Sequence, residues 1–239
     1  ANYFGPSWVF ASLNILFGTW AIYIPQVKDG LAIDNSQLGF AIFFLSLGVF
    51  TVFPFASSLV NKLGVGKATF YGVLLSCAAA MLPLLAPSYY TLMAALFVFG
   101  ASNGFTDISM NTLVTEVEKK DKVKFMSASH GFFSLGGVLA GIGSFLIGPL
   151  GNPVLHMGLA VALVLVVNLM FYKNYVNMTA ALEANEGFSL KLFKPLILLG
   201  LISFIAMGSE GAIVDWSGLY LKEVSIAPEA LWGAGFLGF

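Results

Sequence analysis

The chain has 239 residues, of which 58% are hydrophobic and 10% are charged, whereas a soluble domain is roughly 45–50% apolar and about 25% charged. The formal net charge is -1, and all eleven basic residues are lysines. A nucleic-acid partner is therefore excluded, since the chain has no basic excess and no arginine guanidinium to bind a phosphate group through paired hydrogen bonds. The single cysteine excludes a disulfide framework and a cysteine metal cluster. The composition predicts a membrane protein without a metal site or cofactor.

Runs of spanning length follow one another along the chain. The first, WVFASLNILFGTWAIYI, is followed by Pro25 instead of a small-residue cleavage site, so it is predicted to be the first membrane helix and not a signal peptide. Further runs cover about residues 37–60, 68–86, 90–114, 125–148, 153–172 and 195–221, and an eighth begins near residue 229. The runs lack the alternation of barrel strands, so the sequence predicts an all-α membrane bundle.

Lysines in the connections predict the orientation. Nine lysines lie in alternate connections, after the second, fourth and sixth runs, whereas the other connections hold only Lys28 and Lys222. Cytoplasmic loops carry the excess of positive charge. The sequence therefore predicts a multi-pass protein of the bacterial inner membrane with a cytoplasmic N-terminus.

The longest polar connection divides the chain. We predict an N-terminal six-helix bundle over residues 1–175, a cytoplasmic linker over 176–193 and the beginning of a C-terminal bundle over 194–239. The stretch WAIYIPQVKDGLAIDNSQLGF from Trp20 is similar to WSGLYLKEVSIAPEALWGAGF from Trp216. A repeat separated by an even number of helices indicates two parallel halves, although two membrane hairpins can share an interfacial Trp and Tyr by chance.

The connection after the second run carries a family signature. SSLVNKLGVGK, residues 57–67, resembles the GxLxDRxGRR loop of the major facilitator superfamily, with matches at Lys62 and Gly64. Asn61 stands where the family usually has Asp, which weakens the salt bridge between halves that this loop implies. The segments IPQVKDGLAIDNSQLGFA, SASHGFFSLGGVLAG and EGAIVDWSGLYL resemble a YbjJ-like branch, distantly related to fucose permeases.

This resemblance implies the major facilitator fold. The chain would supply six helices of the first bundle, then helix 7 and part of helix 8 of a second six-helix bundle, with about four helices of the fold beyond Phe239. It also implies a transporter of a small-molecule substrate that acts as a monomer and is not an enzyme. The sequence agrees, since it contains no HExxH, P-loop or GxSxG motif.

Three acidic residues fall inside apolar runs: Asp107, Glu210 and Asp215. A carboxylate near the bilayer centre costs about 2.5–3.5 kcal/mol, so each is a candidate functional group. Asn103, Asp107 and Asn111 follow one another at four-residue steps and share one helix face. This stripe is interpreted either as polar glue between helices or as a site that binds hydroxyls and takes up a proton.

The fifth run places His130 and Ser134 on one face. Asp107 and His130 both fall in the half predicted to be cytoplasmic, so they are expected to meet across the bundle. His130 is interpreted either as a satisfied donor between helices or as a proton relay. His156 is expected at the membrane interface.

Glu210 and Asp215 lie about 140° apart on a helical wheel and therefore need different partners. Glu210 is the better candidate for a central cavity. Asp215, beside Trp216, is expected to tie helices together or to help an outer gate.

These features predict a proton-coupled secondary transporter of a small polar, sugar-like solute that works by alternating access. Asp107, Glu210 and His130 are the proposed proton-coupling residues, and the proposed solute ligands are Asn14, Trp20, Asn103, Asn111 and Ser134. Trp20 could stack on a sugar ring, or form an interfacial belt with Tyr23. The alternative function is proton-driven efflux of amphipathic compounds, which the 23 phenylalanines would suit.

Overall fold

The computed structural model describes residues 3–147, 151–179, 194–228 and 231–237, and these residues form helices without a strand. The seven long helices are α1 (Phe4–Gly30), α2 (Asn35–Leu63), α3 (Val65–Met81), α4 (Tyr89–Asp121), α5 (Met126–Ile147), α6 (Pro153–Phe171) and α8 (Ile197–Glu223). The short helices are η1 (Pro83–Leu85), η3 (Tyr172–Asn174), η4 (Lys194–Leu196) and α9 (Ala234–Leu237). Within the described residues, seven helices are long and apolar enough to cross a membrane, which confirms the predicted all-α membrane fold.

Side-chain caps fix where several of these helices begin. The Asp34 side chain accepts a hydrogen bond from the Gln37 N–H while Gln37 bonds back to Asp34 N–H, and Ser88 and Thr91 form the same capping box on α4. Asn152 caps α6 through the Leu155 N–H. These polar caps meet backbone donors that the first helical turn leaves unpaired.

Two helices extend beyond their predicted apolar runs. α1 continues through Pro25 to Gly30, and α4 continues to Asp121. The added part of α4, residues 115–121, is rich in Glu and Lys, which favour helix and are typical of a segment in water.

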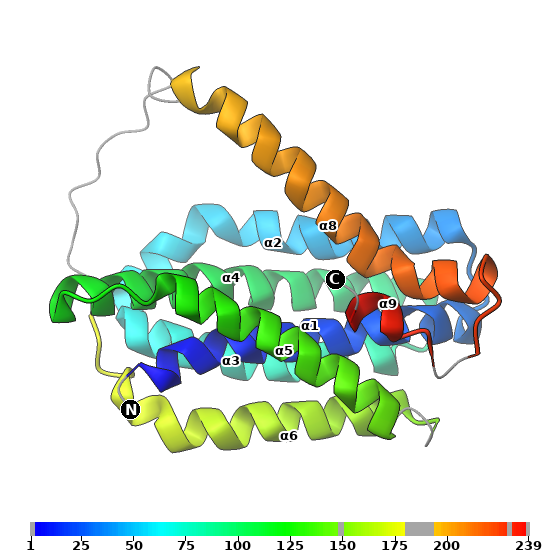
Figure 1. Cartoon of the computed structure of the whole chain (residues 1–239), viewed down its shortest axis with the longest axis horizontal. Coiled ribbons are helices and arrows are strands. Elements are labelled where there is room, and N and C mark those ends of the chain that lie inside the picture. The colour runs from blue at the N-terminus through cyan, green and yellow to red at the C-terminus, as the bar shows by residue number, and fades with distance from the viewer. Residues whose placement is uncertain (1–2, 148–150, 180–193, 229–230, 238–239) are drawn as a thin grey trace.

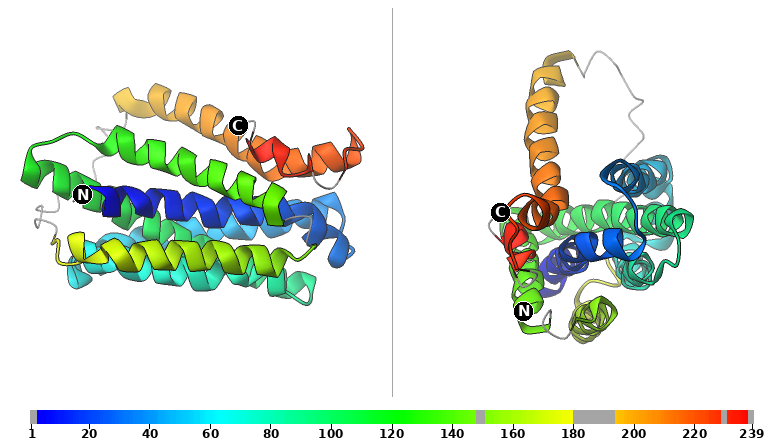
Figure 2. Two further views of the ribbon diagram at one scale, coloured as in Figure 1. Left: turned by 60° about the horizontal axis from the view of Figure 1, so that its bottom comes forward. Right: turned by 90° about the vertical axis from the view of Figure 1, so that its right-hand side faces the viewer.

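α1 forms the centre of the six-helix bundle. In α1, 94% of the most apolar 18-residue window is buried inside the protein. In α2 the corresponding share is 17%, because α2 faces outward. Figure 1 shows α1 between α4, α5 and α6, with α2 on the far side of α4, and Figure 2 shows the same order from two other directions. The polar residues that reach this centre can therefore come from several helices.

Glycines bring α2 and α4 into close contact. A Cβ added at Gly48 would collide with the Phe97 carbonyl, and one at Gly100 would lie 2.7 Å from the carbonyl carbon of Leu45. One at Gly104 would lie 3.1 Å from Val49 Cα. Small residues at such crossings allow membrane helices to pack through their backbones.

Gly100→Ala should therefore lower the melting temperature of the purified protein in detergent. The three atoms nearest to the added methyl group are backbone atoms of Leu45, which cannot move aside as a flexible side chain can, and overpacking of this kind costs about 1–3 kcal/mol. Gly131→Ala is the matched control, because a Cβ there meets no atom within 4 Å. Equal melting temperatures for the two variants would contradict this account of α2–α4 packing.

Polar side chains also link the helices. Ser7 Oγ and Ser129 Oγ lie 2.9 Å apart between α1 and α5, and Asn168 Nδ2 donates to Ser12 Oγ at 2.9 Å between α6 and α1. Tyr175 OH donates to Asn168 Oδ1 at 3.2 Å. Such bonds contribute about 0.6 kcal/mol on average in membrane proteins, so they fix register more than they supply stability.

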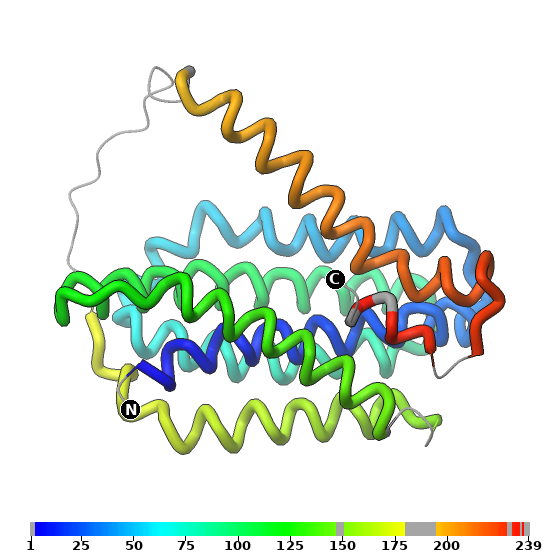
Figure 3. Tube along the Cα trace, viewed as in Figure 1, coloured from blue at the N-terminus to red at the C-terminus, as the bar shows by residue number. Residues whose placement is uncertain are grey.

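The helix ends fall into two sets. The lysine-rich end comprises the α2–α3 and α4–α5 connections and the segment after α6, and the lysine-poor end comprises the α1–α2, α3–α4 and α5–α6 connections and the end of α8. α8 meets the bundle at the lysine-poor end and diverges from it toward the lysine-rich end, as the Cα trace in Figure 3 shows most clearly. Most of the predicted linker, residues 180–193, lies outside the described residues.

Candidate functional site

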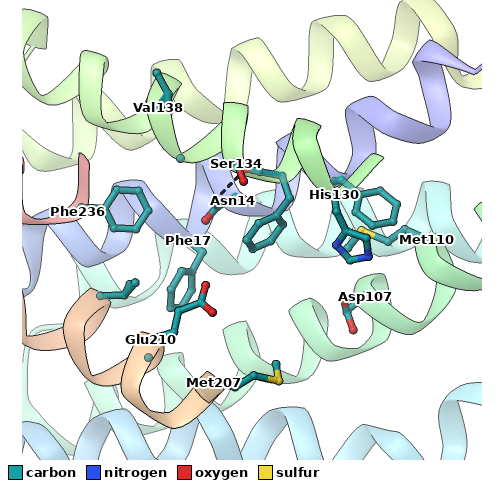
Figure 4. A pocket seen from close by; sticks show the side chains of 15 residues that line it. Asn14, Phe17, Asp107, Met110, His130, Ser134, Val138, Met207, Glu210 and Phe236 are labelled. Atoms are coloured by element: carbon teal, nitrogen blue, oxygen red, sulfur yellow. Dashed lines mark hydrogen bonds between the residues drawn. The ribbon is translucent and has the colours of Figure 1, made fainter. Parts of the chain in front are cut away.

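A cavity of about 660 Å³ lies between α8 and the central helices of the bundle. Figure 4 shows side chains from α1, α4, α5 and α8 pointing toward it. Its wall is formed by Phe10, Asn14, Phe17, Asp107, Met110, His130, Phe133, Ser134, Gly137, Val138, Met207, Glu210, Gly211, Val214 and Phe236. The volume is within the range of small-molecule sites.

Five residues proposed from the sequence line this cavity: Asn14, Asp107, His130, Ser134 and Glu210. They come from four helices, and only His130 and Ser134 share one. Two carboxylates and no lysine occur among the described lining residues. The cavity is therefore polar and acidic at a few points and apolar elsewhere.

Asp107 and His130 lie on the same side of the cavity and point toward each other in Figure 4. Asn111 Nδ2 donates to Asp107 Oδ1 at 3.1 Å and to the Asp107 carbonyl at 2.9 Å. The His130 ring also contacts the Phe10 ring edge-to-face, with 5.2 Å between centroids. Asp107 and His130 are therefore each in contact with a neighbouring side chain, and both line the cavity.

Asn14 is held at the cavity wall by α5. Its Nδ2 donates to the Phe133 carbonyl at 2.9 Å, and a Cβ added at Gly137 would lie 2.9 Å from the same nitrogen. Gly137 therefore leaves the room that the amide occupies.

Glu210 lies at the midpoint of α8 and faces the cavity together with Met207, Gly211 and Val214. Asp215 is half-buried and lies outside the cavity wall. Of the two acids, therefore, Glu210 alone is among the lining residues of this cavity. Trp216 packs beside Gly39 of α2, where an added Cβ would lie 3.5 Å from the indole.

Three other proposed ligands do not line the cavity. Trp20 is fully buried in the hydrophobic core and does not line the cavity, so its stacking and belt roles stay predictions. Asn111 bonds to Asp107 instead, and Asn103 is 8% exposed, with its Oδ1 unpaired among the described atoms. The polar stripe of α4 therefore reaches the cavity only at Asp107.

Two predicted interfacial residues are also buried. Tyr23 and His156 are each 3% exposed, and Tyr23 OH lies 3.0 Å from His156 Nδ1. The pair joins α1 to α6, because a buried imidazole needs a hydrogen-bond partner.

The signature loop between α2 and α3 contacts its own half of the chain. Asn61 and Lys62 are exposed, and Gly64 has a φ of 81°, a conformation that suits glycine at this sharp turn. The Gly66 N–H donates to the Met178 carbonyl at 2.9 Å, which ties the loop to the segment after α6. The predicted gating role of the loop stays a prediction.

The sequence interpretation missed the apolar part of the wall. Phe10 and Phe17 flank Asn14 at helical spacing, and Phe133 precedes Ser134. Residues three or four positions away from a polar cavity residue lie on the same helix face. This spacing in the sequence could therefore have predicted which phenylalanines line the cavity.

Comparison with known proteins agrees with this architecture. The sequence model of the family described as Major Facilitator Superfamily matches residues 7–239 of this chain. The chain belongs to the major facilitator superfamily. This confirms the resemblance of the signature loop.

The chain is also similar to individual members. It is 31% identical over 232 residues to an uncharacterized transporter, y4wD, of Sinorhizobium fredii, which covers 95% of this chain and 60% of the relative. It is 26% identical over 226 residues to the membrane protein MosC of Rhizobium meliloti, which covers 95% and 55%. The chain thus spans less than two thirds of these relatives.

A solved structure shares the fold. The crystal structure of the nucleoside transporter NupG aligns with 98% of this chain and 62% of its own, with a TM-score of 0.69 and 13% identity. At that identity the likeness concerns the fold alone.

Proposed function

We propose that the chain works as a proton-coupled secondary transporter of a small polar, sugar-like solute in the bacterial inner membrane. One observation carries this proposal: Asp107 of α4 and Glu210 of α8 face one cavity between the two halves, and His130 lies beside Asp107. Acidic side chains at membrane depth are costly and serve ion pathways where they occur. No catalytic step is part of the proposal.

Proton coupling follows from the environment of these groups. A carboxylate favours its neutral form when it loses water and its charged form when water or a cation approaches. The halves of superfamily transporters rock about a midplane site, so each carboxylate would change its hydration as the cavity changes side. Protonation and conformation are then linked.

The polar lining suits a solute with several hydroxyl groups. Asn14, Ser134 and His130 offer donors and acceptors, and Asp107 and Glu210 can accept hydrogen bonds from hydroxyls. Phe17 and Phe133 supply flat apolar faces for the carbon side of a ring.

Efflux of amphipathic compounds is the second candidate. It is favoured by the rest of the wall, where four phenylalanines and two methionines lie: Phe10, Phe17, Phe133, Phe236, Met110 and Met207. Methionine-rich and aromatic walls accommodate varied apolar ligands.

Counterflow in proteoliposomes separates the two candidates. Vesicles containing the full-length protein are loaded with an unlabelled solute and then given the same solute in labelled form. We expect transient, saturable accumulation with one class of sugar or cyclitol and none with lipophilic cations. The reverse pattern would support efflux, and exchange of neither class would contradict the proposal.

A further inference from the structure

The contacts between the two halves are concentrated at one end of the molecule. At the lysine-poor end a Cβ added to Gly218 of α8 would lie 3.3 Å from Pro25 Cγ of α1, and one at Gly233 would lie 2.6 Å from Ser144 Oγ of α5. Toward the other end of α8, a Cβ at Gly200 or Gly208 meets no atom within 4 Å. The halves are therefore closed against each other at the lysine-poor end and separated at the lysine-rich end (Figure 1).

An aromatic side chain seals the closed end of the cavity. The Phe236 ring occupies a notch between Gly18 of α1 and Gly137 of α5, where an added Cβ would lie 2.6 Å and 3.3 Å from ring atoms, respectively. Phe236 also lines the cavity. The cavity wall at this end is thus supplied by the second half of the protein.

Beyond this seal lie two ion pairs with a reciprocal pattern. Lys28 at the end of α1 pairs with Glu223 at the end of α8, and Lys222 pairs with Asp29. Asn35 Nδ2 adds a hydrogen bond of 3.2 Å to Glu223, and the Lys222 ammonium lies 5.2 Å from the Trp232 ring centroid. Each half contributes one lysine followed directly by one acid.

We propose that Lys28, Asp29, Lys222 and Glu223 form a releasable clamp that holds the lysine-poor end closed while the cavity is open toward the lysine-rich end. This proposal rests on the proposed alternating access. The two ion pairs of the clamp are the contacts that must break when the cavity opens to the other side of the membrane. Each lysine–acid dipeptide is neutral by itself, so separation leaves no net charge on either half. Both acids are exposed and both lysines are half-buried, and ion pairs that water reaches are individually weak, which makes the clamp reversible.

The reciprocal pattern gives a test in which the effect of one substitution is reversed by another. Spin labels on Ser36→Cys and Ser225→Cys, two exposed positions on opposite halves at this end, report the opening as a distance distribution. Cys77, a buried residue and the one cysteine in these 239 residues, is replaced by alanine in this background, as is any cysteine in the rest of the full-length protein. The measurement uses the full-length protein in nanodiscs without solute.

Lys28→Glu should move population to longer distances, because it sets two carboxylates against each other, and Glu223→Lys should do the same with two ammonium groups. Together, Lys28→Glu and Glu223→Lys should restore the short distance at least to the wild-type fraction, because two acids then face two lysines. Lys173→Glu, the same charge change at the exposed lysine-rich end, is the control and should leave the distribution unchanged.

Two results would overturn the clamp: unchanged distributions in both single variants, or a double variant that is as open as either single variant. The readout needs no transport. A protein that opens as described but exchanges no solute would contradict the proposed function and leave the clamp standing, whereas active transport with unchanged distances would do the opposite.

Discussion

Asp107→Asn should abolish uphill uptake while leaving solute exchange intact. The substitution keeps the shape of the side chain and its contact with Asn111, but it removes the proton that the carboxyl group would carry. A potential of about 100 mV is worth about 2.3 kcal/mol per proton, and about 1.4 kcal/mol is a factor of ten. One coupled proton therefore supports about 50-fold accumulation, which the variant should lose.

The measurement compares steady-state accumulation with counterflow in the same proteoliposomes. Asp34→Asn is the matched control, since Asp34 caps α2 at the surface, outside the cavity, and asparagine is as good a cap. The control should accumulate solute like the wild type. Undiminished uphill uptake by the Asp107→Asn variant would show that the Asp107 carboxylate takes no part in proton coupling.

Glu210→Gln should lower accumulation at least about tenfold, because Glu210 is the carboxylate that α8 presents to the cavity from its midpoint. The measurement is steady-state accumulation in the same proteoliposomes, with the wild type beside it.

Glu116→Gln provides the control for this variant, because Glu116 pairs with the exposed Lys119 on α4, away from the cavity. Wild-type accumulation by Glu210→Gln would exclude its role.

Several parts of the fold followed from local sequence. The capping residues Asp34, Ser88 and Asn152 mark helix starts that the structure shows, and the signature loop at residues 57–67 indicated the family that the comparison shows. The separation of Glu210 from Asp215 followed from helical geometry alone. These features depend on neighbouring residues or on a single helix.

Residues on apolar helices were harder to place. Trp20 was predicted at a solute or an interface, and Tyr23 and His156 at an interface, yet all three are buried. In a soluble protein the buried face of a helix is its apolar face. In a membrane protein, the lipid and the protein core are equally apolar, so both kinds of face carry apolar residues. Composition therefore does not distinguish the face of α1 that meets lipid from the faces that meet other helices.

The sequence by itself determined the class of protein, its spanning helices, its family and the three acids placed at membrane depth. A bilayer leaves few solutions for an apolar chain, and helices satisfy every backbone group internally, so this level of structure is encoded locally. The tertiary structure decided that Asp107, His130 and Glu210 share one cavity, that phenylalanines complete its wall, and that Lys28 and Asp29 meet Glu223 and Lys222. These contacts join positions up to about two hundred residues apart, and helix packing sets them because side-chain direction decides which faces meet.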